Sequence, residues 1–423
     1  MPSTPLKCTR LVLVALLIIS SHGRAAESNT VKDEVATWSI SQIARDYPSK
    51  GTRQSLSMLD GAVSTSFVAE RVTNLSVTEE GDVFEVLFDK GDTPARCSAY
   101  RNVSEVLSGT LLVGHSEITI ARIADDFELE SVEKELLGLT VDHINASPVM
   151  IVHWDLATSS PTATPFEGDL FVVVTTVGST NIACAYFGDG DFRGFLAVLV
   201  NLVDNAKVQQ ERTQAFFEDL AITKVDGKAV GFTKATFSYR EDGNISWESK
   251  TASFYSHESA SLGAWDTSRK ETSTPDGDLI SSSDSSFING SPLGILIMKQ
   301  SETGNWEVDG FFGDENYELV FESKGPLQSQ YGIIATARKG LAGNVAKNMN
   351  FEQFLFFEDS SDLTNVSIEL FPDSLTATME TNSRLTAVDL APDGTPTRMR
   401  SIGEEIERET TRVWSSGEMP EHH

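Results

Sequence analysis

Few histidine side chains in this sequence could do acid–base or metal chemistry. His143 and His153 lie close to Asp142 and Asp155, and these four side chains could supply ligands to a metal ion. His153 lies in an apolar run beside Trp154, which is typical of a buried, hydrogen-bonded histidine. We therefore interpret both histidines as core or surface residues and assign no metal ligand.

Carboxylates are numerous, with 62 Asp and Glu residues, and a pair of them could perform the acid and base steps of glycoside hydrolysis. No pair stands out among so many, so we assign no catalytic residue. The run Asp189-Gly-Asp191-Phe-Arg-Gly194 resembles the start of a calcium loop, but its twelfth position is Val200 rather than Glu. Asp276-Gly-Asp278 and Asp359-Ser-Ser-Asp362 are weaker matches. We interpret all three as solvated acidic loops, while loose calcium binding stays open.

Several catalytic and cofactor motifs are absent from the sequence. It has no phosphate-binding Gly-x-x-x-x-Gly-Lys-Ser/Thr loop, no dinucleotide fingerprint after a strand and no Cys-x-x-Cys pair. Gly114-His115-Ser116-Glu117-Ile118 lacks the second glycine of a nucleophile elbow. His257-Glu258 begins like a zinc-protease motif, but Ser261 stands where the second histidine is needed. We therefore predict no cofactor.

The composition is strongly acidic. The 62 acidic and 33 basic residues give a formal charge of −29 and a pI near 4.5. Nucleic-acid affinity depends on Lys and Arg that displace counterions, so this composition excludes a phosphate-backbone binder. An apolar fraction of 40% and 23 Phe residues exclude a wholly disordered chain.

The first 26 residues have the layout of a secretory signal peptide. Lys7 and Arg10 precede nine apolar residues, 11–19, and small residues follow up to Ala26. The apolar run is too short to span a bilayer, and Cys8 lies before it, where it could not serve as a lipoprotein anchor. We predict that residues 1–26 are removed, and that the mature protein is soluble, secreted or periplasmic, and not inserted in a membrane.

Removal of this segment changes the charge and the cysteine count. Three basic residues leave, so the charge becomes −32, and Cys97 and Cys184 remain as an even pair. In an oxidising compartment these two cysteines can form a disulfide, which is the interpretation we favour. Two buried free thiols are the alternative.

The two cysteines occupy matching places in an internal repeat. Residues 80–100 (EGDVFEVLFDKGDTPARCSAY) align without gaps with residues 167–187 (EGDLFVVVTTVGSTNIACAYF), and eight of 21 positions are identical. Equivalent cysteines would meet if they lay near a pseudo-twofold axis. The flanking segments predict strands at 63–77, 110–122, 149–155 and 195–203, and helices at 126–137 and 207–220. We therefore predict two α+β units, 62–148 and 149–221, each an antiparallel sheet backed by a helix.

Residues 222–384 are predicted to form a mainly antiparallel β domain, either a barrel or a sandwich. Residues 237–239 and 245–247 flank an Asp-Gly turn, which is a strong hairpin signal. Residues 256–289 are rich in Ser, Thr and Asp without clear periodicity, and they predict a long loop. Further strands are expected at 294–299, 306–312, 317–322, 332–338, 351–357, 366–371 and 374–379.

Helices are expected near both ends of the chain. Ser39-Ile-Ser-Gln42 is a capping box, which predicts a short helix within the N-terminal segment 27–61, ended by Pro48. Residues 385–423 are predicted to form a linker and a C-terminal amphipathic helix, because Met399, Ile402, Ile406 and Val413 have roughly helical spacing. This helix is expected to dock on its own domain, with a partner-binding helix and a disordered tail as alternatives.

One stretch resembles a known family. Gly304-Asn-Trp-Glu-Val-Asp-Gly-Phe-Phe-Gly313 and Tyr331-Gly-Ile-Ile-Ala-Thr-Ala-Arg338 are similar to the closing strands of barrel domains in transferrin-binding-protein-like surface proteins. The resemblance implies a barrel but covers fewer than 40 residues and carries over no functional residue. Those proteins are usually lipid-anchored, whereas this sequence lacks the anchor cysteine.

Taken together, the sequence predicts an α+β fold with tandem duplicated sheet-plus-helix units followed by the β domain. The favoured function is a non-catalytic secreted or periplasmic protein that binds a protein or small-molecule ligand. One alternative is an extracytoplasmic carboxylate-dependent hydrolase or lyase, either with or without assistance from a bound calcium ion. A concave site with two carboxylates of raised pKa beside aromatics such as Trp247, Trp265 or Trp306 would favour that enzyme. A structural component of an envelope or surface assembly is the third class.

Overall fold

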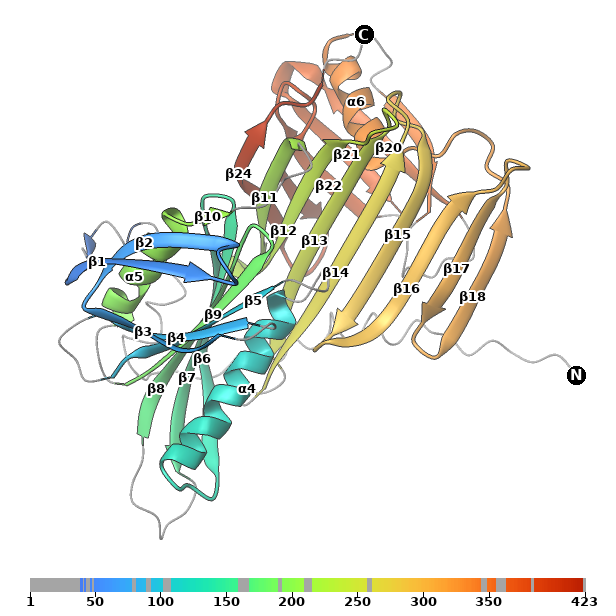
Figure 1. Cartoon of the computed structure of the whole chain (residues 1–423). Coiled ribbons are helices and arrows are strands. Elements are labelled where there is room, and N and C mark those ends of the chain that lie inside the picture. Colours follow the sequence, from blue (N-terminus) through green and yellow to red (C-terminus); the bar gives the residue numbers. More distant parts are fainter. Residues whose placement is uncertain are drawn as a thin grey trace, which may run out of the picture.

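The computed structural model describes residues 39–40, 42, 46–47, 49–77, 81–88, 93–101, 108–158, 167–188, 192–208, 215–256, 261–343, 348–354, 363–381 and 384–420. These residues form a mainly antiparallel β structure with one small and two large sheets. Helix α4 (Ser108–Asp126) lies where the two large sheets meet (Figure 1). The predicted signal peptide lies outside the described residues.

The small sheet is formed by β1 (Thr52–Met58), β2 (Val63–Ala69) and β10 (Lys207–Val208). β1 and β2 form a hairpin whose turn residues Leu59, Asp60 and Gly61 have φ values of 55°, 55° and 87°. Every second side chain of β2 is buried, as a strand with one covered face requires. These side chains pack against helix α5 (Phe192–Asp204).

The second sheet has seven antiparallel strands in the order β3-β4-β5-β9-β8-β7-β6. Helix α5 packs on one face, in a core with Val173 and Cys184, and helix α4 packs on the other, in a core with Val172 and Ala183. Strands buried on both faces read as continuous apolar runs. The bounds are β3 (Arg71–Val77), β4 (Gly81–Leu87), β5 (Ala95–Arg101), β6 (Val132–Ile144), β7 (Ser147–Thr158), β8 (Glu167–Val177) and β9 (Thr180–Phe187).

The third sheet has fourteen antiparallel strands. Their order is β18-β17-β16-β15-β14-β13-β12-β11-β24-β23-β22-β21-β20-β19, so every neighbouring pair except β11 and β24 is consecutive in the sequence. The bounds are β11 (Ala215–Val225), β12 (Lys228–Tyr239), β13 (Ile245–Ser256), β14 (Leu262–Ser273), β15 (Leu279–Ile288), β16 (Ser291–Gln300), β17 (Trp306–Phe312), β18 (Glu315–Phe321), β19 (Asn348–Gln353), β20 (Thr364–Phe371), β21 (Thr376–Thr381), β22 (Arg384–Leu390), β23 (Pro396–Ile402) and β24 (Arg408–Gly417).

The fourteen-stranded sheet bends back on itself like a barrel that stays open at one seam. The edge strands are β18 and β19, and they approach near their C-terminal ends, where the rings of Phe321 and Phe354 stack with centroids 5.6 Å apart. Helix α6 (Gln330–Leu341) lies at one end of the bent sheet (Figure 1). Its residues Tyr331 and Ile334 pack into a core with Phe217 and Phe237.

Three segments that were predicted as strands are helices. Residues 110–122 belong to α4, residues 195–203 to α5 and residues 332–338 to α6. A short apolar run does not by itself distinguish a buried strand from a buried helix. α5 shows the reason, because it lies between two sheets and buries eight of its thirteen residues.

Other segments that were predicted as helix or loop are strands. Residues 132–137 belong to β6, residues 207–208 to β10 and residues 215–220 to β11. The loop expected at 256–289 contains β14 and β15, and the C-terminal helix expected within 385–423 is replaced by β22, β23 and β24. β10 pairs with the distant strand β2, and β24 pairs with the distant strand β11. The other strands pair with their neighbours in the chain, and in all of them strand pairing overrides the local helical spacing. Within 27–61, Ile40, Gln42 and Asp46 are helical, but residues 52–58 form β1.

The duplicated sheet-plus-helix units are not confirmed, because both segments contribute to one seven-stranded sheet. Phe84 pairs with Cys97, whereas its counterpart in the sequence alignment, Phe171, pairs with Tyr186 instead of Cys184. The two hairpins therefore differ in register by two residues. In addition, α4 and α5 lie on opposite faces, whereas a twofold axis through the paired cysteines would place them on the same face.

Candidate functional site

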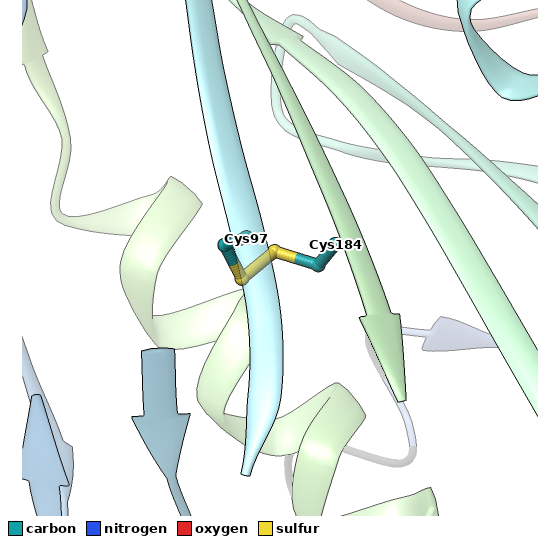
Figure 2. The surroundings of a disulfide bond; sticks show 2 residues. All are labelled: Cys97 and Cys184. Carbon is teal, nitrogen blue, oxygen red and sulfur yellow. A yellow bond between two sulfur atoms is a disulfide. The ribbon is translucent and has the colours of Figure 1, made fainter. Parts of the chain in front are cut away.

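Cys97 and Cys184 form a disulfide between neighbouring strands of the seven-stranded sheet (Figure 2). They are directly paired across β5 and β9, with a Cα–Cα distance of 4.0 Å. Both are almost completely buried, in the core that includes α5. The bond therefore has the position of a structural cross-link, away from solvent and from reducing or attacking thiols.

A groove of about 710 Å³ lies along the seam of the fourteen-stranded sheet. Residues 348–352 of β19 line one side, together with Asn365 of β20. The other side is lined by residues 324–326 and 328 of the connection after β18 and by Ile333 and Thr336 of α6. Its volume lies within the range of about 300–1,000 Å³ that is usual for ligand sites.

The groove runs along the edge of β19. Successive side chains of a strand point to opposite faces, so a groove that meets five consecutive residues follows the edge, where backbone N–H and C=O groups point. β19 ends the order of the sheet, and among the described residues it pairs with β20 alone. The opposite wall contains Pro326, which has no backbone N–H to donate.

Both ends of this wall are fixed by hydrogen bonds. Glu352 accepts a hydrogen bond from the Lys324 backbone N–H, with an N–O distance of 3.2 Å. Gln328 donates from its side-chain Nε2 to Asp278, at 3.2 Å, and its backbone forms a bridge with the same residue. The groove is therefore largely pre-formed, which reduces the entropy that a ligand must overcome on binding.

A charged cluster lies beneath the first turn of α6. Glu271 accepts a hydrogen bond from the Gln330 backbone N–H at 2.6 Å, and its other oxygen lies 2.8 Å from an Arg269 guanidinium nitrogen. Asp284 pairs directly with Arg269 across β14 and β15. Burial raises the pKa of Asp284 to about 7, with a smaller rise from Glu271 and an opposing effect of Arg269. The Arg269 guanidinium therefore contacts Glu271 and acts electrostatically on Asp284, and its Cζ atom lies 6.0 Å from the centre of the Trp247 ring.

A second buried carboxylate connects the two large sheets. Asp266 of β14 accepts hydrogen bonds from the backbone N–H groups of Gly109 and Thr110, at 2.9 and 2.8 Å, and from the Thr110 hydroxyl at 2.7 Å. These contacts cap the start of α4 from another part of the chain. Burial raises the pKa of Asp266, and the hydrogen bonds from Thr110 and Gly109 oppose that rise.

The histidine and aspartate side chains that were considered as metal ligands have other partners in the structure. His153 is buried and lies 2.6 Å from Asp169 through its Nε2 atom, with its ring stacked on Phe171 at 4.1 Å. Asp142 instead accepts a hydrogen bond from the Ile40 backbone N–H at 2.7 Å. His143 lies 3.3 Å from the Asn145 carbonyl oxygen. In the part of the chain that the structure describes, no three His, Cys, Asp or Glu side chains gather closely enough to hold a metal ion.

Of the remaining motif residues, some lie in the described part of the chain and others lie outside it. Asp278 lies in the turn before β15, where it contacts Gln328. His115 of α4 is buried, and burial together with Arg122 and Arg96 lowers its pKa to about 4. Residues 189–191, 257–258 and 359–362 lie outside the described residues.

Within the described ranges, no helix combines the length and the apolar character needed to cross a bilayer.

Sequence reasoning missed the groove, because its walls come from segments on both sides of α6. The segment 324–328 was not assigned to any element, and 332–338 was assigned to a strand. The one local signal was Gly325-Pro326, which disfavours a regular strand at that place.

Comparisons with known proteins identify no family. No protein-family description matches the chain, and no curated protein matches its sequence. One solved structure with similarity is a beta-barrel-like protein of the domain of unknown function DUF1849 from Brucella abortus. The match covers 49% of this chain and 99% of that protein, with 11% sequence identity and a TM-score of 0.37.

Proposed function

We propose that this chain is a secreted or periplasmic, non-catalytic protein that binds an extended peptide segment of a partner protein in the groove beside β19. The observation that carries the proposal is the contact of the groove with five consecutive residues, 348–352, at the edge of the sheet. Such an edge offers backbone groups for peptide recognition, and neighbouring side chains offer specificity. A chain with a buried disulfide and an N-terminal signal-like segment suits an oxidising, extracytoplasmic compartment.

The binding proposal is tested by selection from a displayed library of random dodecapeptides on the full chain. We expect selected peptides to bind the wild-type protein and to lose binding to Thr336→Trp, because the indole fills the groove from α6. Lys339→Trp is the matched control, since Lys339 is exposed on the same helix and does not line the groove. Asn350→Trp blocks the groove from the opposite wall, so the test does not depend on one variant.

Three outcomes would contradict this function. A library that yields no peptide would remove the peptide-binding proposal. Peptides that bind Thr336→Trp and Asn350→Trp as tightly as wild type would place binding elsewhere. Retention of oligosaccharides on a glycan array, lost in both variants, would assign the groove to a different class of ligand.

Export has its own test. The proposal expects that the protein collected outside the cytoplasm begins at Glu27, after the small residues that end at Ala26. Mass spectrometry of the intact N-terminal peptide measures this directly. A protein that keeps residues 1–26 and stays in the cytoplasmic fraction would refute export.

A second candidate function is hydrolysis or elimination by carboxylates around Asp284. The supporting observation is that burial raises the pKa of Asp284 to about 7, as a general acid at neutral pH requires, and that its strand partner Arg269 lies 6.0 Å from the Trp247 ring. However, Glu271, the other carboxylate, is engaged with Gln330 and Arg269. Release of nitrophenol from a panel of nitrophenyl glycosides by wild type, but not by Asp284→Asn, would support this candidate.

A further inference from the structure

We infer that the partner peptide pairs with β19 as an added strand, so that it extends the fourteen-stranded sheet into its seam. This inference rests on the proposed function and specifies how the ligand is held. β19 is an edge strand among the described residues, and its residues 348–352 face the groove along that edge. An extended peptide placed there can exchange backbone hydrogen bonds with β19, as neighbouring strands do in the rest of the sheet.

The length of the edge sets the length of the bound segment. β19 has six residues, but Gln353 does not line the groove and Glu352 contacts Lys324 of the facing wall, so the open edge covers residues 348–351. A strand rises about 3.3 Å per residue, so the paired segment spans roughly 13 Å. Proline inside this segment would remove a donor and break the pairing. The facing wall of the groove contains Gly325 and Pro326. Pro326 has no backbone N–H with which it could pair with β19, so the edge of β19 stays open to a ligand.

The side chains of β19 specify the alternation that the partner needs. Met349 is buried and Phe351 is half-buried on the inner face, where they pack with the core around Ile368. Asn348 and Asn350 are exposed on the outer face. Because side chains of paired strands lie beside each other on the same face, the partner would carry apolar residues at alternate positions and polar residues between them. The net charge of −29 disfavours an acidic partner.

The opposite edge of the sheet is a poorer template. β18 carries the exposed residues Glu315 and Glu318, and its outer face continues into exposed Asp309 of β17. Charges along an edge strand are a common protection against unwanted pairing. In β19 the single carboxylate, Glu352, is held by Lys324, with a side-chain N–O distance of 3.7 Å and a hydrogen bond from its backbone N–H.

The inference is tested by backbone methylation of a selected dodecapeptide. Two versions carry N-methyl groups at alternate residues, one at odd and the other at even positions, and all side chains stay the same. An added strand directs only one of these two sets of N–H groups toward β19. With about two hydrogen bonds lost at roughly 1 kcal/mol each, we expect one version to bind about thirtyfold more weakly. The other version should bind within about threefold of the parent peptide.

The outcomes separate this inference from the function on which it rests. If both versions bind like the parent, or both are weakened equally, strand addition is wrong. If Thr336→Trp and Asn350→Trp still abolish binding of the parent peptide in that case, peptide binding in the groove stands. If the parent peptide binds these two variants and wild type equally, both the inference and the proposed function are wrong.

Discussion

The strongest quantitative prediction concerns Asp284, whose carboxyl group is buried beside Glu271 and Arg269. Its pKa rises from an ordinary value of 3.8 to about 7 in the folded protein, because burial disfavours the charged form. A raised pKa means that the folded state binds this proton more tightly than the unfolded state does. Stability from this group is therefore fully present below about pH 4 and is lost as the pH rises toward 7. A shift of about three units corresponds to about 4 kcal/mol.

Asp284→Asn replaces the carboxyl group with a neutral group of the same size and removes this pH dependence. We expect the variant and the wild type to have similar free energies of unfolding at pH 4. At pH 8 the variant should be more stable by about 4 kcal/mol. Urea denaturation followed by circular dichroism at both pH values measures the difference.

The control is Asp309→Asn, which removes the same charge from an exposed position of the same sheet. It should change stability by less than about 0.5 kcal/mol at either pH. A stability difference between Asp284→Asn and wild type that is the same at pH 4 and pH 8 would refute the reasoning. It would mean that the buried carboxyl group does not change its charge between these conditions.

Three further predictions concern the scaffold. Replacing Cys97 and Cys184 together by Ala should lower the free energy of unfolding by about 4–5 kcal/mol, because the bond closes a loop of roughly 88 residues. An unchanged midpoint of urea unfolding would mean that the bond is not formed. Ser329→Ala should lower the free energy of unfolding by about 1–2 kcal/mol, because the buried Ser329 hydroxyl accepts from the Gly332 N–H at the start of α6 and donates to the Gly277 carbonyl oxygen. An unchanged free energy in the same assay would mean that water replaces the cap. Gly332→Ala should destabilise the protein more than Ser329→Ala, because its Cβ would lie 2.4 Å from the Gly277 carbonyl oxygen; equal thermal midpoints would contradict that contact.

The β-rich half of the fold could be predicted where turn chemistry is local. The hairpin around Asp242-Gly243 is confirmed, with Tyr239 paired to Ile245 at its base. Its Asp-Gly turn and alternating strands act over a dozen residues and need no distant partner. The strands predicted at 294–299 and 306–312 are also confirmed, as β16 and β17.

Prediction failed where burial on two sides or distant pairing decides the structure. α5 lies between two sheets and buries eight of its thirteen residues, so residues 195–203 form an apolar run with a single polar residue, which resembles a buried strand. β24 has Arg412 and Glu409 in a charged background, and it becomes a strand because it pairs with β11, about 190 residues earlier. No local pattern in β24 carries that information.

The candidate site could be predicted from the sequence only in part. The pairing of Cys97 with Cys184 followed from counting cysteines after residue 26, and the structure contains that bond. The groove depends on α6 standing beside the free edge of β19, which is a tertiary arrangement. The cluster of Arg269, Glu271 and Asp284 lies within a Ser- and Thr-rich segment that suggested a loop, so its alternation was not recognised.

The pairing of β11 with β24 has a consequence for how the chain folds. All other neighbouring strands of the fourteen-stranded sheet are consecutive in the sequence and are joined by hairpins or short connections. Such local contacts form early because their loops close at little entropic cost. β24 is synthesised last, so the edge of β11 waits unpaired while almost 190 residues emerge. During this interval β11 is the strand most exposed to wrong partners. We therefore expect the joining of β24 to β11 to limit the folding rate, and a chain truncated before Arg408 to aggregate.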